Sequence, residues 1–146
     1  MRIDIRELIL NDSDLFRLLE WVTADRADLK LNSAGFTSQG VITKGTLKTP
    51  LGILSYEMLW CLSLDGGVVT SKLSNLKLGQ SMPIPFLKTV VMEQVHSLLK
   101  GLPGIESKGD SIRITGKHLL EAQGANLAKE ISSLDLSMGE LRAGFE

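Results

Sequence analysis

The segment from Leu51 to Leu64, LGILSYEMLWCLSL, alternates apolar and mixed positions over fourteen residues. Read with a period of two, one side carries no charge and has a tyrosine hydroxyl as its only polar group; its members are Gly52, Leu54, Tyr56, Met58, Trp60, Leu62 and Leu64. Such alternation predicts a β-strand with one buried face. Extended residues rise about 3.3 Å each, so this strand would span roughly 45 Å and would have to curve around a core.

The residues after this strand predict a hairpin. Asp65-Gly66-Gly67 supplies the glycines that a tight turn requires, and Val68 to Leu78 reads as the returning strand. Val69 and Leu73 fall on one parity of that strand, whereas Leu76 and Leu78 fall on the other. A change of phase within a strand predicts a β-bulge, here near Ser74-Asn75.

The remaining elements are predicted from caps, breakers and periodicity. Ser13 is the predicted N-cap of a helix that ends near Thr23 or Ala24. A longer helix is expected from Pro85 to about Lys100. Further strands are expected over 1–8, 27–31, 35–48, 111–115 and 134–145, the last with a turn or bulge at Gly139, and a further helix over 118–131.

The apolar residues of the middle helix predict its surroundings. They fan over roughly 200° of its circumference, about twice what one flat sheet would cover. We therefore expect an α+β fold in which a strongly curved antiparallel sheet wraps round a long central helix, with a short helix near each end. One domain over 1–146 is expected. The similar order of apolar residues in 1–36 and 110–146 is consistent with a strand-helix-strand pseudo-repeat around a central unit, 37–109, although leucine is common enough for chance to produce it.

The order of elements from Gly40 to Thr115 resembles that of the tubular lipid-binding (TULIP-like) superfamily, particularly bacterial members similar to phospholipid-binding envelope proteins. The resemblance rests on the long alternating strand, the DGG hairpin, a strand ending in LKLG, the MPIP loop, a helix ending in LKGLPG and the short strand IRI. It implies a helix wrapped in a bent sheet and a protein that binds or carries lipid without catalysis. We expect the chain to depart from this family in being shorter than most members and in lacking a signal peptide.

Charge and composition exclude several classes of function. The 16 basic and 17 acidic residues give a net charge of −1, so nucleic acid is not an expected partner. No apolar run approaches the ~18 residues of a membrane span, so a cytoplasmic protein with at most peripheral membrane contact is expected. The single cysteine, Cys61, is interpreted as a buried reduced thiol.

Patterns that suggest catalysis are weak in this sequence. Ser74 with Lys77, and Ser97 with Lys100, match the serine-lysine pattern without its companion motifs. His96 and His118 have no second pair of ligands at zinc spacing. We therefore expect no enzyme activity, no metal and no cofactor.

Two functional interpretations remain open from the sequence. The first is binding of a lipid or another apolar ligand in a groove between the curved sheet and the middle helix. Its predicted site residues are Leu54, Tyr56, Met58, Trp60, Leu62, Val91, Val95 and Leu98. The second is a structural or protein-interaction module with a filled core, oligomeric through its strand edges. Six lysines are expected on a solvated face, or at a mouth where they would meet anionic head groups: Lys30, Lys44, Lys48, Lys72, Lys77 and Lys88.

Overall fold

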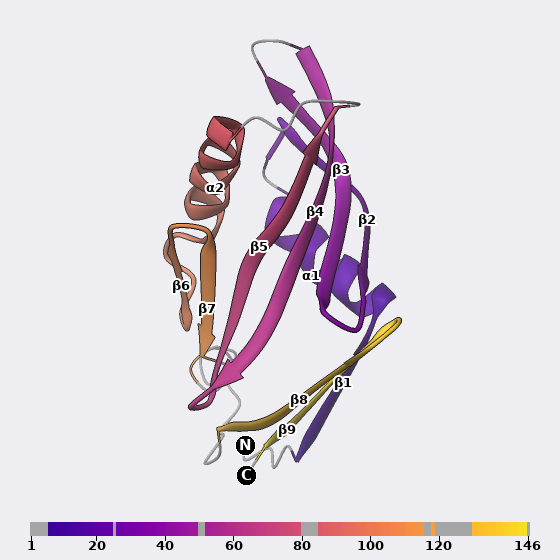
Figure 1. Ribbon diagram of the computed structural model, residues 1–146, viewed down its shortest axis with the longest axis vertical. Helices are drawn as coiled ribbons and strands as arrows, with labels where there is room; N and C mark the ends of the chain where they lie inside the picture. Colours follow the sequence, from indigo (N-terminus) through magenta and orange to yellow (C-terminus); the bar gives the residue numbers. More distant parts are fainter. Residues whose placement is uncertain are drawn as a thin grey trace.

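The computed structural model describes residues 6–24, 26–49, 52–79, 85–115, 118 and 130–145, and its described part is mainly β. Within these residues, nine strands form two antiparallel sheets, accompanied by two helices (Figure 1). The elements are β1 (Glu7–Asn11), α1 (Asp12–Thr23), β2 (Leu29–Phe36), β3 (Gly40–Thr49), β4 (Gly52–Asp65), β5 (Val68–Leu78), α2 (Pro85–Leu99), β6 (Ile105–Lys108), β7 (Ser111–Thr115), β8 (Ile131–Ser137) and β9 (Glu140–Phe145).

The larger sheet has six strands in the order β2-β3-β4-β5-β7-β6. The predicted long strand is confirmed as β4, which has 14 residues and lies near the middle of the sheet. Gly66 and Gly67 join it to β5, with φ of 58° and 80° respectively. Two successive residues with positive φ fit the twist of the flanking strands, which is why a Gly-Gly pair ends β4 here.

The predicted bulge in β5 is also confirmed. The register places Leu59 opposite Asn75 and Trp60 opposite Leu73, which leaves Ser74 as the extra residue. The Ser74 hydroxyl donates a hydrogen bond of 3.2 Å to the carbonyl of Leu59. Because one residue is inserted, Leu76 returns to the same face of the sheet as Leu73.

The smaller sheet has the order β1-β9-β8 and lies across the lower end of the larger one in Figure 1. Its strands β8 and β9 are a hairpin with Gly139 in the turn at φ 82°. The predicted single strand over 134–145 is therefore two strands, divided at Gly139. β8 contacts β4 and β9 contacts β2, so the two sheets pack against each other.

Helix α1 begins two residues earlier than the sequence predicted. Its N-cap is Asn11, whose side chain accepts from the backbone N–H of Asp14 at 2.9 Å, while the Asp14 carboxylate accepts from the Asn11 N–H at 3.0 Å. In this reciprocal pair, each side chain accepts a hydrogen bond from the backbone N–H of the other residue, which caps the start of the helix at Asn11. Ser13 therefore lies inside the helix.

The end of the outer strand β2 is covered by polar contacts. Asp12 accepts a hydrogen bond of 2.8 Å from the backbone N–H of Phe36. The N–H of Gly139 donates to the Phe36 carbonyl at 3.0 Å. Phe36, at the edge of the sheet, is thereby hydrogen-bonded both to the start of α1 and to the β8–β9 turn.

The expected fold, a curved sheet wrapped round a long central helix with a short helix near each end, is wrong. Helix α2 lies beside the β6–β7 hairpin at one side of the larger sheet, and it contacts β6 (Figure 1). Its broad apolar arc reflects burial, with Val91 and Met92 exposed by 6% and 4%, and burial alone does not specify a surrounding sheet. The inner side of the larger sheet is shared among several elements, so no central helix is required.

Some sequence predictions differ from the structure at their boundaries or lie outside its described part. Strand β6 was not predicted, and β2 continues to Phe36 beyond the expected 27–31. The helix expected over 118–131 falls almost wholly outside the described residues, although Ile131 itself begins β8. The single-domain and pseudo-repeat interpretations remain predictions.

Candidate functional site

The predicted apolar row of β4 faces inward and is packed into a core. Tyr56, Met58 and Trp60 are exposed by only 6%, 8% and 7%. They share one cluster with residues from the larger sheet, the smaller sheet and α2, namely Phe36, Val41, Leu47, Leu73, Val91, Met92 and Leu141.

The structure brings most of the eight predicted ligand residues together. Tyr56, Met58, Trp60 and Val91 belong to the cluster itself. The partly buried side chains of Leu54, Leu62 and Val95 pack against it. Leu98 is half-buried and does not belong to this described cluster. Seven of the eight predicted residues thus belong to one core or pack against it, and their burial supplies apolar stabilisation whether or not a ligand enters.

Tyr56 is held in a fixed position within this core. It lies opposite Gly45 on β3, and its hydroxyl donates a long hydrogen bond of 3.5 Å to the carbonyl of Lys30. Burial raises the pKa of Tyr56 to about 12, because the phenolate would lose its hydration. The hydroxyl therefore stays protonated at neutral pH.

Thr43 is a polar residue on the same inner face, directly opposite Met58. It is exposed by 6%, and its Oγ1 has no hydrogen-bond partner. A buried hydroxyl without a partner costs about 1–3 kcal/mol.

The outward face of the larger sheet has a different chemistry. Because cross-strand partners share a face, the register places seven exposed basic side chains opposite to the core side. They are Lys30, Lys44, Lys48, Lys72, Lys77, Lys108 and Arg113. The same face carries three acidic residues, Glu57, Asp65 and Glu106, so its formal charge is +4. We call this surface the lysine face.

The lysine face also carries apolar side chains. Ile42 and Leu59 are direct cross-strand partners and half-buried, and Ile53 is exposed by 67%. Its lower corner holds a shallow hollow of about 240 Å³ lined by Val68, Glu106, Arg113 and Thr115.

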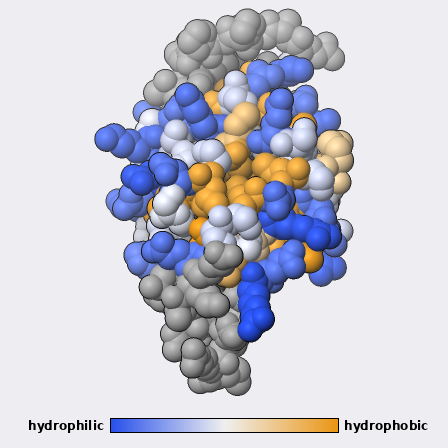
Figure 2. All heavy atoms as spheres, turned by 60° about the horizontal axis from the view of Figure 1, so that its bottom comes forward, coloured by the Kyte–Doolittle hydropathy of each residue, from blue (hydrophilic) through white to orange (hydrophobic). Residues whose placement is uncertain are grey.

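The molecule seen with the lower end of Figure 1 brought forward shows apolar side chains gathered in the middle of the visible surface and bordered by hydrophilic ones (Figure 2).

The sequence predicted part of the lysine face. Five of its six expected lysines lie there, and the side chain of the sixth, Lys88, is outside the described part. Lys108 and Arg113 were missed. The alternation of ESK with the IRI strand was the available signal, but strand β6 is too short to be recognised by its pattern alone.

The serine and histidine residues considered as catalytic candidates form hydrogen bonds or close polar contacts with other parts of the fold. Ser74 is the bulge residue bonded to Leu59, and Ser97 accepts a hydrogen bond of 2.6 Å from Arg26. His96 Nε2 lies 3.2 Å from the carbonyl of Gly109. Among the described residues, no group of three or more His, Cys, Asp or Glu side chains could hold a metal ion.

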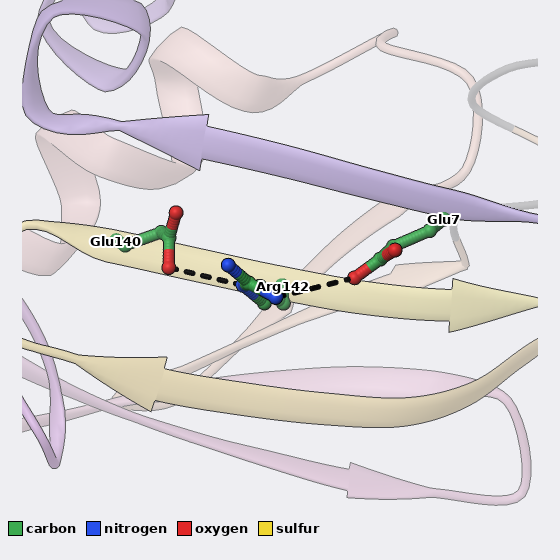
Figure 3. A network of polar contacts seen from close by, with 3 residues as sticks. All are labelled: Glu7, Glu140 and Arg142. Carbon is green, nitrogen blue, oxygen red and sulfur yellow. Dashed lines mark hydrogen bonds and ion pairs between the residues drawn. The ribbon is translucent and has the colours of Figure 1, made fainter.

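A second charged surface lies on the smaller sheet (Figure 3). Arg142 on β9 is 3.0 Å from Glu140 and 3.9 Å from Glu7 on β1. The two carboxylates raise the pKa of Arg142, and the main cause is the hydrogen bond that Arg142 donates to Glu140. About half of the Arg142 and Glu7 side chains is exposed, so this network is a solvated cross-strand pairing.

Comparisons with models of protein families, with curated proteins and with solved structures found no match. In the described part of the chain, no helix is long and apolar enough to cross a membrane.

Proposed function

We propose that this protein is a non-enzymatic binding module, with the inner face of its larger sheet packed as a core and the lysine face as its binding surface. The observation that carries the proposal is the contrast between the two faces of one strand. On β4, Tyr56, Met58 and Trp60 are buried, whereas Glu57 and Cys61 are half-buried on the opposite face, where their cross-strand partners are Lys44, Lys77 and Lys72.

Charge supports this choice of surface. The whole chain has a net charge of −1 while the lysine face has +4, so the rest of the chain has −5. A local field of one sign on a nearly neutral protein attracts oppositely charged partners to one side only.

The proposal is tested by amine-reactive labelling with mass spectrometry. The modification of Lys44, Lys72 and Lys77 is compared between the purified protein and the protein in a crude lysate that retains its membranes. Protection of these three lysines in the lysate, with Lys100 labelled equally in both samples, is expected. Lys100 is the control because it is exposed at the end of α2, away from the lysine face. Equal labelling of all four lysines in both samples would refute a binding role for this surface.

A second candidate function is binding of a lipid or other apolar ligand on the inner face, as the resemblance to TULIP-like proteins implies. Thr43 is the observation that favours it, because a polar atom of a ligand would satisfy the buried Oγ1. Native mass spectrometry of the purified protein, followed by extraction and lipid analysis, tests this function. Co-purifying lipid supports it, and a clean apo mass with no uptake of added lipid argues against it.

We also propose a cytoplasmic location and a homo-oligomer formed through strand edges. The edges available for pairing in the described part are β2 and β6 of the larger sheet and β1 and β8 of the smaller one. The covered end of β2 at Phe36 leaves less of that edge for pairing. Light scattering of the purified protein across a concentration series measures the oligomeric mass.

A further inference from the structure

We propose that the partner of the lysine face is the surface of an anionic lipid bilayer. This inference rests on the proposed function, because it names the partner of the same surface.

The arrangement of charge on the lysine face suits a surface of many phosphates. Lys44, Glu57 and Lys77 are successive neighbours across β3, β4 and β5, with Lys44 Nζ 4.0 Å from Glu57. Lys72 and Lys108 are separated only by Ser111 across β5, β7 and β6. The ammonium groups are thus distributed over the width of the sheet, as contact with a planar array of head groups requires, instead of converging on one small anion.

The apolar residues of the lysine face provide the second component of interfacial binding. Ile53 is exposed by 67% and lies next to Lys48 across the β3–β4 ladder. An exposed branched side chain beside a lysine can enter the acyl boundary while the ammonium group stays among the head groups.

The residue types favour a bilayer over a protein or a nucleic acid. Lysine is depleted in protein–protein interfaces, where arginine and aromatic residues are enriched, and this face has six lysines and one arginine. Single-stranded nucleic acid stacks on aromatic side chains. The outward positions of the six described strands of the larger sheet carry no aromatic residue, since Phe36, Tyr56 and Trp60 all face the core.

The test is flotation of the full chain with vesicles of phosphatidylcholine alone or with 30% phosphatidylserine, at low and high salt. Binding to the anionic vesicles at low salt, and its loss at high salt, is expected because counterions screen these contacts. Each basic residue near an anionic surface contributes about a fivefold factor in partitioning. Lys44→Gln/Lys72→Gln/Lys77→Gln should therefore weaken binding by about 100-fold.

The matched control is Arg6→Gln/Arg17→Gln/Lys100→Gln, which removes the same charge from exposed residues outside the lysine face. It should bind as the wild type does, and circular dichroism checks that both variants are folded. Ile53→Thr keeps a branched residue and should reduce the binding that remains at intermediate salt by several-fold.

Three results would overturn the inference: no binding of wild type to anionic vesicles at low salt, equal losses in the two triple variants, or tighter binding to single-stranded RNA than to vesicles. If vesicles fail while Lys44, Lys72 and Lys77 are protected in the lysate, the bilayer is wrong and the binding surface stands. If the lysate gives no protection either, both proposals fail.

Discussion

Gly45 and Tyr56 lie opposite each other on β3 and β4, and a β-carbon on Gly45 would lie 2.6 Å from the Tyr56 hydroxyl. The backbone carbonyl of Lys30 closes the same space and cannot move aside easily. Gly45→Ala should therefore lower the free energy of unfolding by about 2–3 kcal/mol, as overpacking does. Urea unfolding measures it, with Thr46→Ala on the outward face as a control of small effect. A Gly45→Ala protein as stable as the wild type would show that Tyr56 does not occupy this position.

Tyr56 should make stability fall at high pH. Its folded pKa of about 12 exceeds the unfolded value of 10.0, so its contribution is complete below pH 10 and is lost as pH rises toward 12. The loss is about 1–3 kcal/mol, relative to Tyr56→Phe, which lacks the titrating group.

Tyr56 is the only tyrosine of the chain, so tyrosinate absorbance reports this group directly. A midpoint near 12 is expected while circular dichroism still shows a folded protein. A midpoint near 10 in folded protein would mean that the hydroxyl is in contact with water.

The bulge in β5 makes a prediction about register. Deleting Ser74 removes the extra residue and leaves Asn75 opposite Leu59 and Leu76 opposite Met58, so both halves of the strand keep their register. In a strand without a bulge, the same deletion would instead move Leu76 to the outward face. We expect the deletion variant to unfold cooperatively, with a stability close to that of Ser74→Ala, which loses the hydrogen bond to Leu59, about 1 kcal/mol. Thermal denaturation measures both variants, and loss of cooperative unfolding in the deletion variant alone would contradict the bulge at Ser74.

The N-cap of α1 gives a matched pair of variants. Asn11→Ala should destabilise the protein by about 1 kcal/mol, because it leaves the Asp14 N–H without its side-chain acceptor. Ser13→Ala should change stability much less, because Ser13 lies inside the helix and is exposed. The reverse ranking in urea unfolding would restore Ser13 as the cap.

The fold could be predicted from the sequence wherever a local pattern decides the structure. Strict alternation identified β4, Gly66 and Gly67 identified its turn, and the change of phase between Leu73 and Leu76 identified the bulge. The pairing of β1 with β9 and the position of α2 depend on contacts between distant segments, which periodicity does not encode. The broad apolar arc of α2 predicted correctly that the helix is buried, but incorrectly that a curved sheet surrounds it.

The candidate surface was predictable in part for the same reason. Alternation assigns Lys44 and Lys48 to the side opposite Tyr56 once β3 and β4 are known to pair. Lys108 joins them only through β6, a four-residue strand whose partner β7 comes later in the chain. Whether Met58 lines a groove or a core depends on the volume beside it, and alternation does not measure volume.

The claim that the inner face of the larger sheet is a filled core is tested most directly through Trp60. Trp21→Phe leaves Trp60, exposed by 7%, as the only tryptophan, and Trp60→Phe leaves Trp21, exposed by 67%, as the control for quencher access. Brominated fatty acid quenches tryptophan on contact. We expect the fluorescence of Trp60 to be unchanged by brominated fatty acid and by acrylamide, and that of Trp21 to be quenched by acrylamide. Saturable quenching of Trp60 by the brominated fatty acid in folded protein would contradict it and would establish a ligand groove on the inner face.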